Sequence, residues 1–121
     1  MNETEGTLAI STHTHPAGPV VLRLAGELDH YTGPSLRRAV EDVLRSPGTG
    51  IVADLSDLVY CDSTGMTVII TAYHRAQAAG SSFSVGGLSA VMTQLFRVAG
   101  LDQIFPMHSS VQDAVDALGR K

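Results

Sequence analysis

The chain has 121 residues, a length that suits one domain built around one hydrophobic core. Charged residues make up 17% of it and the formal net charge is −4, without the cluster of Lys or Arg that nucleic-acid binding requires. The single cysteine excludes an internal disulfide, the N-terminus lacks a signal-peptide pattern, and no apolar stretch reaches the roughly 20 residues that span a bilayer. These features favour a cytoplasmic protein that binds neither nucleic acid nor a membrane.

The spacing of apolar and turn-forming residues predicts strands and helices that alternate along most of the chain. Pro34, for example, suits the first turn of a helix that Thr32 or Gly33 caps. The expected elements, in order, are strands at 7–14 and 20–24, a helix at 34–44, a strand at 51–55 with apolar character continuing to 60, a helix at 64–79, a strand at 83–85, a helix that Ser89 caps and that reaches 99, a strand at 103–105 and a helix at 111–118.

Apolar residues recur at helical spacing in each predicted helix and mark the face that we expect to pack against the sheet. They are Leu36, Ala39, Val40, Val43 and Leu44 in the first helix, Met66, Ile69, Ile70 and Tyr73 in the second, Val91, Met92, Leu95, Phe96 and Val98 in the third, and Val111, Val115 and Leu118 in the fourth.

Alternation of strands and helices predicts an α/β fold with a single-layer mixed sheet, mostly parallel, to which the first two strands add an antiparallel edge hairpin. About four helices accompany this sheet. No repeat, low-complexity tract or linker divides the chain, so we expect a single domain over 1–121 with its core at about 7–118.

The most informative segment is Asp62-Ser63-Thr64-Gly65, which stands where an apolar strand region passes into a helix. The first backbone N–H groups of a helix have no intrahelical partner and carry partial positive charge, so they stabilise an anion. Asp62 or Ser63 can therefore be the N-cap of the helix. A Ser63 that does not cap is a candidate for a switchable negative charge.

A second polar segment, 26–32, also follows a strand and precedes a helix. Loops at the carboxyl ends of parallel strands gather on one rim of an α/β sheet, so we expect Glu27 and Asp29 to lie near Ser63. On composition alone, these two carboxylates favour a solvated acidic turn.

Together, the two segments resemble the anti-anti-sigma factors, the stand-alone STAS domains of bacterial partner-switching systems. Gly26-Glu27-Leu28-Asp29 with Thr32, followed by Asp62-Ser63-Thr64-Gly65-Met66, carries the resemblance. It extends from Leu8 to Leu118 and includes 95–101 and 104–106. Two positions differ from the family pattern, because Cys61 replaces a larger apolar residue and Thr64 replaces a second Ser.

The resemblance implies an anti-sigma factor antagonist that is not an enzyme. It implies that an anti-sigma factor with serine kinase activity binds the chain, releases its sigma factor, and ends the complex by phosphorylating Ser63, with Thr64 as a minor acceptor. A serine phosphatase resets the switch. The chain needs no cofactor or metal, because ATP and magnesium belong to the kinase.

The resemblance also places a docking aspartate at Asp29, which we therefore expect at the surface and not in the core. The full set of expected partner-binding residues is Glu27, Asp29, His30, Thr32, Asp62, Ser63, Thr64, Gly65 and Met66.

Several alternatives remain at this stage. A STAS scaffold or sensor module in another signalling complex would not be controlled through Ser63. A hydrolase with Ser63 as its nucleophile would need His30 or His74 as a base, and Cys61 stands where a Gly-x-Ser-x-Gly elbow has its first glycine.

Three further residues suggest other chemistry but favour simpler roles. Asp54 lies at a strand end like a receiver phosphoacceptor, although the later lysine of such domains is missing. His13 and His15 alternate on a strand, without an evident third metal ligand. Cys61 is expected to be a small core residue.

Overall fold

The computed structural model describes residues 7–118 of the chain, and the ends of the expected domain, 1–6 and 119–121, lie outside this description. The strands are β1 (Leu8–Thr14), β2 (Val20–Leu28), β3 (Ile51–Cys61), β4 (Phe83–Gly86) and β5 (Met107–His108). The helices are α1 (Gly33–Val43), α2 (Ser63–Ala78), α3 (Ala90–Val98) and α4 (Val111–Leu118), with a 3-10 turn η1 at Leu101–Gln103.

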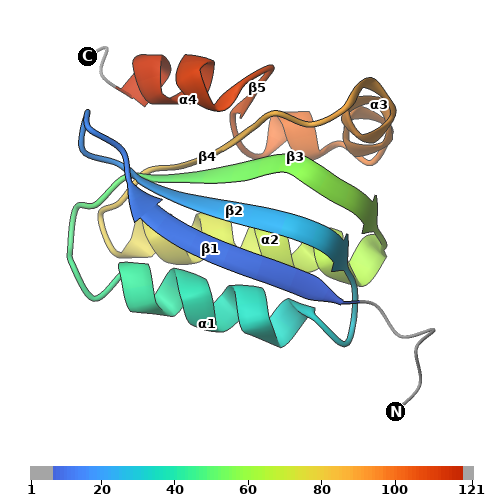
Figure 1. The fold of residues 1–121 in the computed structure, drawn as a ribbon, viewed down its shortest axis with the longest axis horizontal. Helices are drawn as coiled ribbons and strands as arrows, with labels where there is room; N and C mark the ends of the chain where they lie inside the picture. Colours follow the sequence, from blue (N-terminus) through green and yellow to red (C-terminus); the bar gives the residue numbers. More distant parts are fainter. Residues whose placement is uncertain (1–6, 119–121) are drawn as a thin grey trace.

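The five strands form one sheet in the order β1-β2-β3-β4-β5. β1 pairs antiparallel with β2, and every other neighbouring pair is parallel. Helices α1 and α2 cover one face of the sheet, and α3 and α4 lie on the other (Figure 1). The predicted fold class is confirmed, including the antiparallel hairpin at the N-terminal edge.

β3 is the centre of the core because helices pack against both of its faces. Ile51 and Leu55 belong to the larger hydrophobic cluster, which joins the sheet to α1, α2 and α3. Val52, which points the other way, packs with Ala114 and Val115 of α4. An uninterrupted apolar sequence at 51–53 is what a parallel strand buried on both faces requires.

The end of β3 differs from the prediction, because the strand continues without a break to Cys61. The polar residues Ser56 and Asp57 obscured this continuation in the sequence. Irregularities in the pairing with β2, between Arg23 and Ala25 and again after Gly26, adjust the register so that both strands reach the same rim.

The predicted strand at 103–105 is wrong. Gly100 takes a left-handed conformation, with φ +85°, and ends α3. The chain then forms η1, and the amide of Phe105 donates to the carbonyl oxygen of Leu101 over 3.2 Å. Both of these side chains are buried, so a short apolar stretch that resembles a strand in sequence is here a compact turn before β5.

The predicted helix faces hold for α1 but only in part for α2 and α3. In α2, Ile69 is buried while Met66, Ile70 and Tyr73 are partly buried, and Val68, Ala72 and Ala76 complete the buried face. In α3 only Met92 and Phe96 are buried. The other three members of the predicted α3 face are exposed, namely Val91, Leu95 and Val98.

Candidate functional site

The first turn of α2 assigns different roles to two neighbouring residues. Asp62 is the N-cap, and its Oδ1 accepts a hydrogen bond of 2.8 Å from the amide of Gly65. The first intrahelical bond follows, as Met66 donates its amide hydrogen to the carbonyl oxygen of Asp62 over 2.9 Å. Ser63 is the first helical residue and is exposed. The capping role thus belongs to Asp62, which leaves the Ser63 hydroxyl at the surface beside the helix N-terminus.

Gly65 holds this turn close to the sheet. It is buried, and a Cβ atom there would collide with the carbonyl oxygen of Leu28 and lie 3.0 Å from Cys61 Sγ. Any larger residue would push the start of α2 away from the end of β2. Gly65 therefore sets the position of the first turn of α2 against the sheet and does not present a side chain to a partner.

The loop between β2 and α1 is held by its own side chains. Asp29 Oδ1 accepts hydrogen bonds from the amides of Tyr31, at 2.9 Å, and Thr32, at 3.0 Å. The Thr32 hydroxyl accepts one from the amide of Asp29, at 2.9 Å, and donates one to the carbonyl oxygen of Glu27, at 2.8 Å. These four bonds fix the loop before the helix starts.

The expectation that Asp29 is a surface residue is wrong, because Asp29 and Thr32 are each only 8% exposed. Burial follows from the hydrogen bonds, which turn the carboxylate inward onto the loop backbone. Thr32 occupies the N-cap position of α1, yet its side chain makes no capping bond to that helix. Asp29 and Thr32 therefore fix the conformation of the loop, and the exposed residues His30 and Tyr31 lie between them.

The two loops lie together, as predicted. β2 pairs Leu28 with Cys61, and the amide of Asp62 donates to the carbonyl oxygen of Leu28 over 3.3 Å. A shallow hollow of about 420 Å³ joins them. The residues that line it are Glu27, Asp29, His30, Tyr31, Tyr60 and Asp62.

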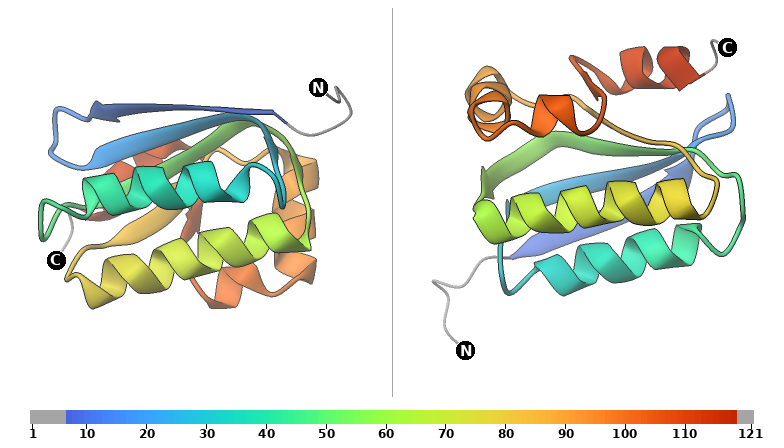
Figure 2. Two further views of the ribbon diagram at one scale, coloured as in Figure 1. Left: turned by 90° about the horizontal axis from the view of Figure 1, so that it is seen from below. Right: turned by 180° about the vertical axis from the view of Figure 1, so that it is seen from behind.

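Sequence reasoning missed several exposed apolar side chains around this rim. Tyr31 is 63% exposed, Val59 is 73% exposed and Tyr60 is 48% exposed. Figures 1 and 2 show α3 at the same end of the molecule as the N-terminus of α2, and α3 carries the exposed residues Val91, Leu95 and Val98. Their spacing of four and three residues was visible in the sequence, but it indicated a buried face just as well.

A family model described as "Mlab, STAS domain" matches residues 11–108. The chain belongs to the STAS domain family. This STAS domain is 30% identical over 105 residues to an anti-sigma F factor antagonist of Paenibacillus polymyxa, a match that covers 86% of this chain and 90% of that protein. It is 35% identical over 81 residues to an anti-sigma-B factor antagonist of Listeria monocytogenes, over 67% of this chain and 71% of that one.

Solved structures show the same fold. An anti-sigma factor antagonist from Mycobacterium paratuberculosis aligns with a TM-score of 0.84 at 24% identity, over 94% of this chain and 96% of that chain. SpoIIAA in its unphosphorylated form aligns with a TM-score of 0.74 at 21% identity, over 92% of this chain and 95% of that chain. Within residues 7–118, the STAS domain has no helix with the length and hydrophobicity needed to cross a bilayer.

Cys61 is a core residue of this STAS domain, as predicted. It is 4% exposed, and burial, assisted by the negative charge of Asp62, raises the pKa of its thiol to about 12. The thiol therefore stays protonated near neutral pH and is a poor nucleophile.

Of the two histidines expected as a base for Ser63, His30 lies at the rim, whereas His74 follows Ser63 along α2 by about 16 Å at the helical rise of 1.5 Å per residue. Within residues 7–118, no hydrogen bond joins the Ser63 hydroxyl to His30 or His74. The ring of His30 instead packs edge-on against Tyr31, and that of His74 against Tyr73, each with 5.4 Å between centroids. The described residues thus lend no support to a hydrolytic Ser63, which would need a base within hydrogen-bond reach.

The remaining candidates take part in local structure. Asp54 Oδ1 accepts a hydrogen bond from the amide of Ser56 over 3.0 Å, within β3. His15 Nδ1 accepts one from the amide of Ala17, also over 3.0 Å, in the turn between β1 and β2. His13 is exposed on β1, the edge strand.

Proposed function

We propose that this STAS domain is an anti-sigma factor antagonist that binds an anti-sigma factor with serine kinase activity and thereby frees a sigma factor. One observation carries the proposal: Ser63 is exposed at the N-terminus of α2 while Asp62 makes the cap. The names of the Paenibacillus and Listeria relatives support the same role.

In the proposed switch, the Ser63 hydroxyl oxygen attacks the γ-phosphorus of ATP that the kinase holds with magnesium. The bond from that phosphorus to the ADP oxygen breaks, and a base of the kinase takes the hydroxyl proton. A phosphatase later hydrolyses the phosphoester, which restores the hydroxyl and releases inorganic phosphate. The STAS domain supplies only the acceptor, so it is neither an enzyme nor a holder of cofactors, and the ATP requirement fits the cytoplasm.

The charge of the phosphate explains how binding would end. A phosphoryl group adds roughly −1.5 to −2 charges at neutral pH, and the amides of the first helical turn can donate hydrogen bonds to its oxygens without refolding. Asp62 and the hollow with Glu27 and Asp29 already make this rim acidic. A partner that fits a neutral hydroxyl would then meet repulsion and an added desolvation cost.

The structure divides the expected partner-binding residues into two groups. His30, Ser63 and Thr64 are exposed and can touch a partner directly, and Glu27, Asp62 and Met66 are partly exposed. Asp29, Thr32 and Gly65 are buried, so in this proposal they position the exposed residues.

Apolar surface beside the acidic rim would supply most of the binding area. Tyr31 and Tyr60 line the hollow, and aromatic side chains are enriched in protein interfaces. The exposed stripe of Val91, Leu95 and Val98 on α3 extends the apolar surface at the same end of the molecule. We infer a partner with an apolar docking face around the kinase active site.

Phosphorylation can be tested directly. Incubation with an ATP-binding anti-sigma kinase from the same genome, followed by phosphopeptide mapping, should place the phosphate on Ser63. Ser63→Ala should abolish it, and Thr64→Ala, the matched control one residue away, should retain it. Phosphate found only at Thr64, Asp54 or a histidine would contradict the assignment.

Binding to the same kinase separates this function from a STAS scaffold that does not use Ser63. Titration calorimetry should give nearly equal affinities for the wild type and Ser63→Ala, because only a hydroxyl is lost. Ser63→Asp should bind at least about tenfold more weakly, since it adds a charge at the centre of the face. Equal affinities for the two variants would favour the scaffold.

A further inference from the structure

The two edges of the sheet are protected to different degrees. β5, at one edge, has only two residues. β1, at the other, has seven, and Leu8–Thr14 contains no Pro, Lys, Arg, Asp or Glu. Short strands, charges and prolines are the usual means by which proteins keep an edge from pairing with another strand. β1 has none of these means.

Along β1, the backbone N–H and C=O groups of successive residues point alternately toward β2 and toward the free edge of the sheet. At one end the carbonyl oxygen of Thr7 accepts from the amide of Glu27 over 2.9 Å, and at the other the amide of His15 donates to Pro19 over 2.8 Å. Hydrogen-bonded residues alternate in an antiparallel pair, so the odd-numbered residues face β2. The backbone groups at the free edge therefore belong to Leu8, Ile10, Thr12 and Thr14.

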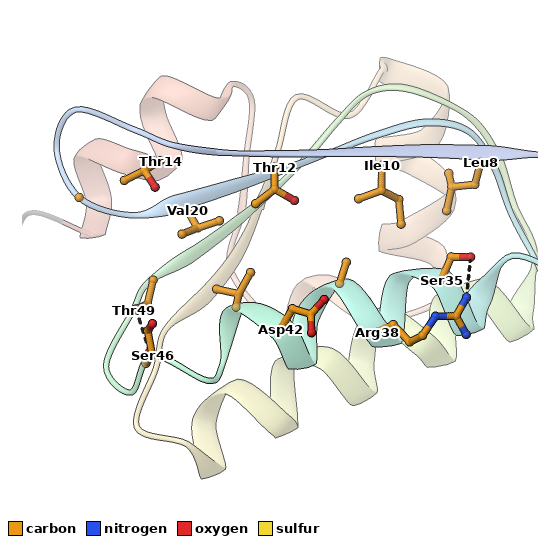
Figure 3. Close-up of a pocket in the computed structure, with 13 residues that line it drawn as sticks. Leu8, Ile10, Thr12, Thr14, Val20, Ser35, Arg38, Asp42, Ser46 and Thr49 are labelled. Atoms are coloured by element: carbon orange, nitrogen blue, oxygen red, sulfur yellow. Dashed lines mark hydrogen bonds between the residues drawn. The ribbon is translucent and has the colours of Figure 1, made fainter.

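Beside this edge, a groove of about 700 Å³ lies between β1 and α1 (Figure 3). The side chains of the same four even-numbered residues line it along the whole length of β1. Arg38 and Asp42 of α1 are the charged residues among its lining. A groove that follows a strand edge suits an extended chain that pairs with that edge, rather than a compact ligand.

We propose that β1 pairs antiparallel with β1 of a second copy, which joins the two sheets across a twofold axis through Ser11. In this register all seven residues of β1 are paired. Ile10 lies opposite Thr12 of the second copy, and Leu8 lies opposite Thr14. Each of these residues points its backbone N–H and C=O groups to the free edge, so in this register those groups form hydrogen bonds with the opposite strand in both copies. Ser11 meets its own copy, where a small side chain permits close approach.

The charges on α1 favour a second copy over an unrelated peptide. In Figure 3 the Arg38 side chain starts from α1 below Ile10 and extends toward Leu8 and Ser35, and Asp42 lies below Thr12. A twofold axis through Ser11 exchanges the levels of Ile10 and Thr12, so the position of Arg38 on α1 of each copy faces Asp42 of the other, and the Arg38 side chain turns from Ser35 to meet it. Such an arrangement is self-complementary, as an isologous interface requires. Among residues 7–118 of one chain, Arg38 donates a 3.4 Å hydrogen bond to Ser35 Oγ, and Asp42 lies 3.6 Å from Arg45. Arg38 and Asp42 are both exposed, so a second copy can reach both charges.

Charge reversal tests the interface by sedimentation equilibrium over a range of concentrations. Arg38→Asp should raise the dimer dissociation constant at least about tenfold, because it faces Asp42 of the second copy with a like charge. The double variant Arg38→Asp/Asp42→Arg should restore the dimer. Arg37→Asp makes the same change of charge on an exposed neighbour that does not line the groove, and it should leave the constant unchanged.

A backbone variant tests the strand pairing itself. Thr12→Pro removes an amide that points to the free edge, so it should dissociate the dimer, while Thr12→Val keeps that amide and should not. In the wild type, amide exchange of Leu8, Ile10, Thr12 and Thr14 should slow as concentration rises. A wild type that stays monomeric up to about 1 mM, or a dimer that survives both Arg38→Asp and Thr12→Pro, would overturn the proposal.

Discussion

At the start of α2, Asp62 caps the helix and Ser63 presents the exposed hydroxyl, so two residues have separate roles. Asp62 accepts the Gly65 amide, a contact whose loss typically costs about 1 kcal/mol. Ser63 takes no part in this bond, so a change in its charge does not remove a cap. The stability of α2 and the chemical state of its first residue are therefore separate.

Two substitutions of Asp29 distinguish its hydrogen bonds from its charge. Asp29→Ala leaves the amides of Tyr31 and Thr32 without their acceptor, and the free energy of unfolding should fall by about 1–3 kcal/mol in urea denaturation. Asp29→Asn retains an acceptor oxygen and should lose less than about 1 kcal/mol.

If both Asp29 variants lost the same stability, the charge of Asp29 and not its geometry would hold the loop. An unchanged Asp29→Ala would mean that the loop does not depend on this side chain. Partner binding by Asp29→Asn, measured separately, then reports on the charge alone.

The position of the helix start could be predicted from sequence, with Asp62 or Ser63 as its cap, whereas the choice between these two residues and the burial of Asp29 could not. A cap depends on residue types within one turn, as Asp62 and Gly65 show. Asp29 is buried because Thr32 and the carbonyl oxygen of Glu27 close around it, and nothing in an acidic, polar segment distinguishes this arrangement from a solvated turn.

Among the elements, α2 depends on a close approach that only glycine permits. Gly65→Ala should destabilise the protein by about 1–3 kcal/mol, because the added methyl group meets the backbone of β2 at Leu28. Helix propensity alone would predict a gain of about 1 kcal/mol, so the sign of the change is decisive.

Thr64→Ala is the control for Gly65→Ala, since it introduces the same residue one position earlier on an exposed site. Thermal unfolding should show little loss for Thr64→Ala. A stabilised Gly65→Ala variant would mean that the start of α2 does not lie against β2.

Element order could be predicted from apolar periodicity, but which apolar residues are buried depends on tertiary packing. Leu95 and Phe96 are adjacent in α3, yet Leu95 is 43% exposed and Phe96 is fully buried. The same limit explains the strand wrongly predicted at 103–105, where Phe105 fills the core from a turn. Local patterns indicate that a residue is apolar, and the fold decides where it points.

For the molecule as a whole, phosphorylation of Ser63 should leave the fold unchanged. The core cluster holds α2 through Val68, Ile69 and Ala72, none of which the phosphate would touch. Circular dichroism of the free and phosphorylated forms should superimpose, and amide-exchange differences should stay within the segments around Asp29 and Ser63.

Weaker protection that spreads into α3 on phosphorylation would instead indicate a conformational switch. Ser63→Ala treated with kinase and ATP is the matched control for this comparison, because it undergoes the same incubation without the modification.

The separation of cap and acceptor at 62 and 63 bears on how long a signal would persist. A switch whose state is a rearranged fold loses that state when the fold relaxes. Here the state would reside in one phosphoester bond, and uncatalysed hydrolysis of phosphate monoesters is among the slowest reactions known. The phosphorylated state would thus last until a phosphatase hydrolyses the phosphoester. Its lifetime would be set by the abundance of that enzyme rather than by any property of this chain.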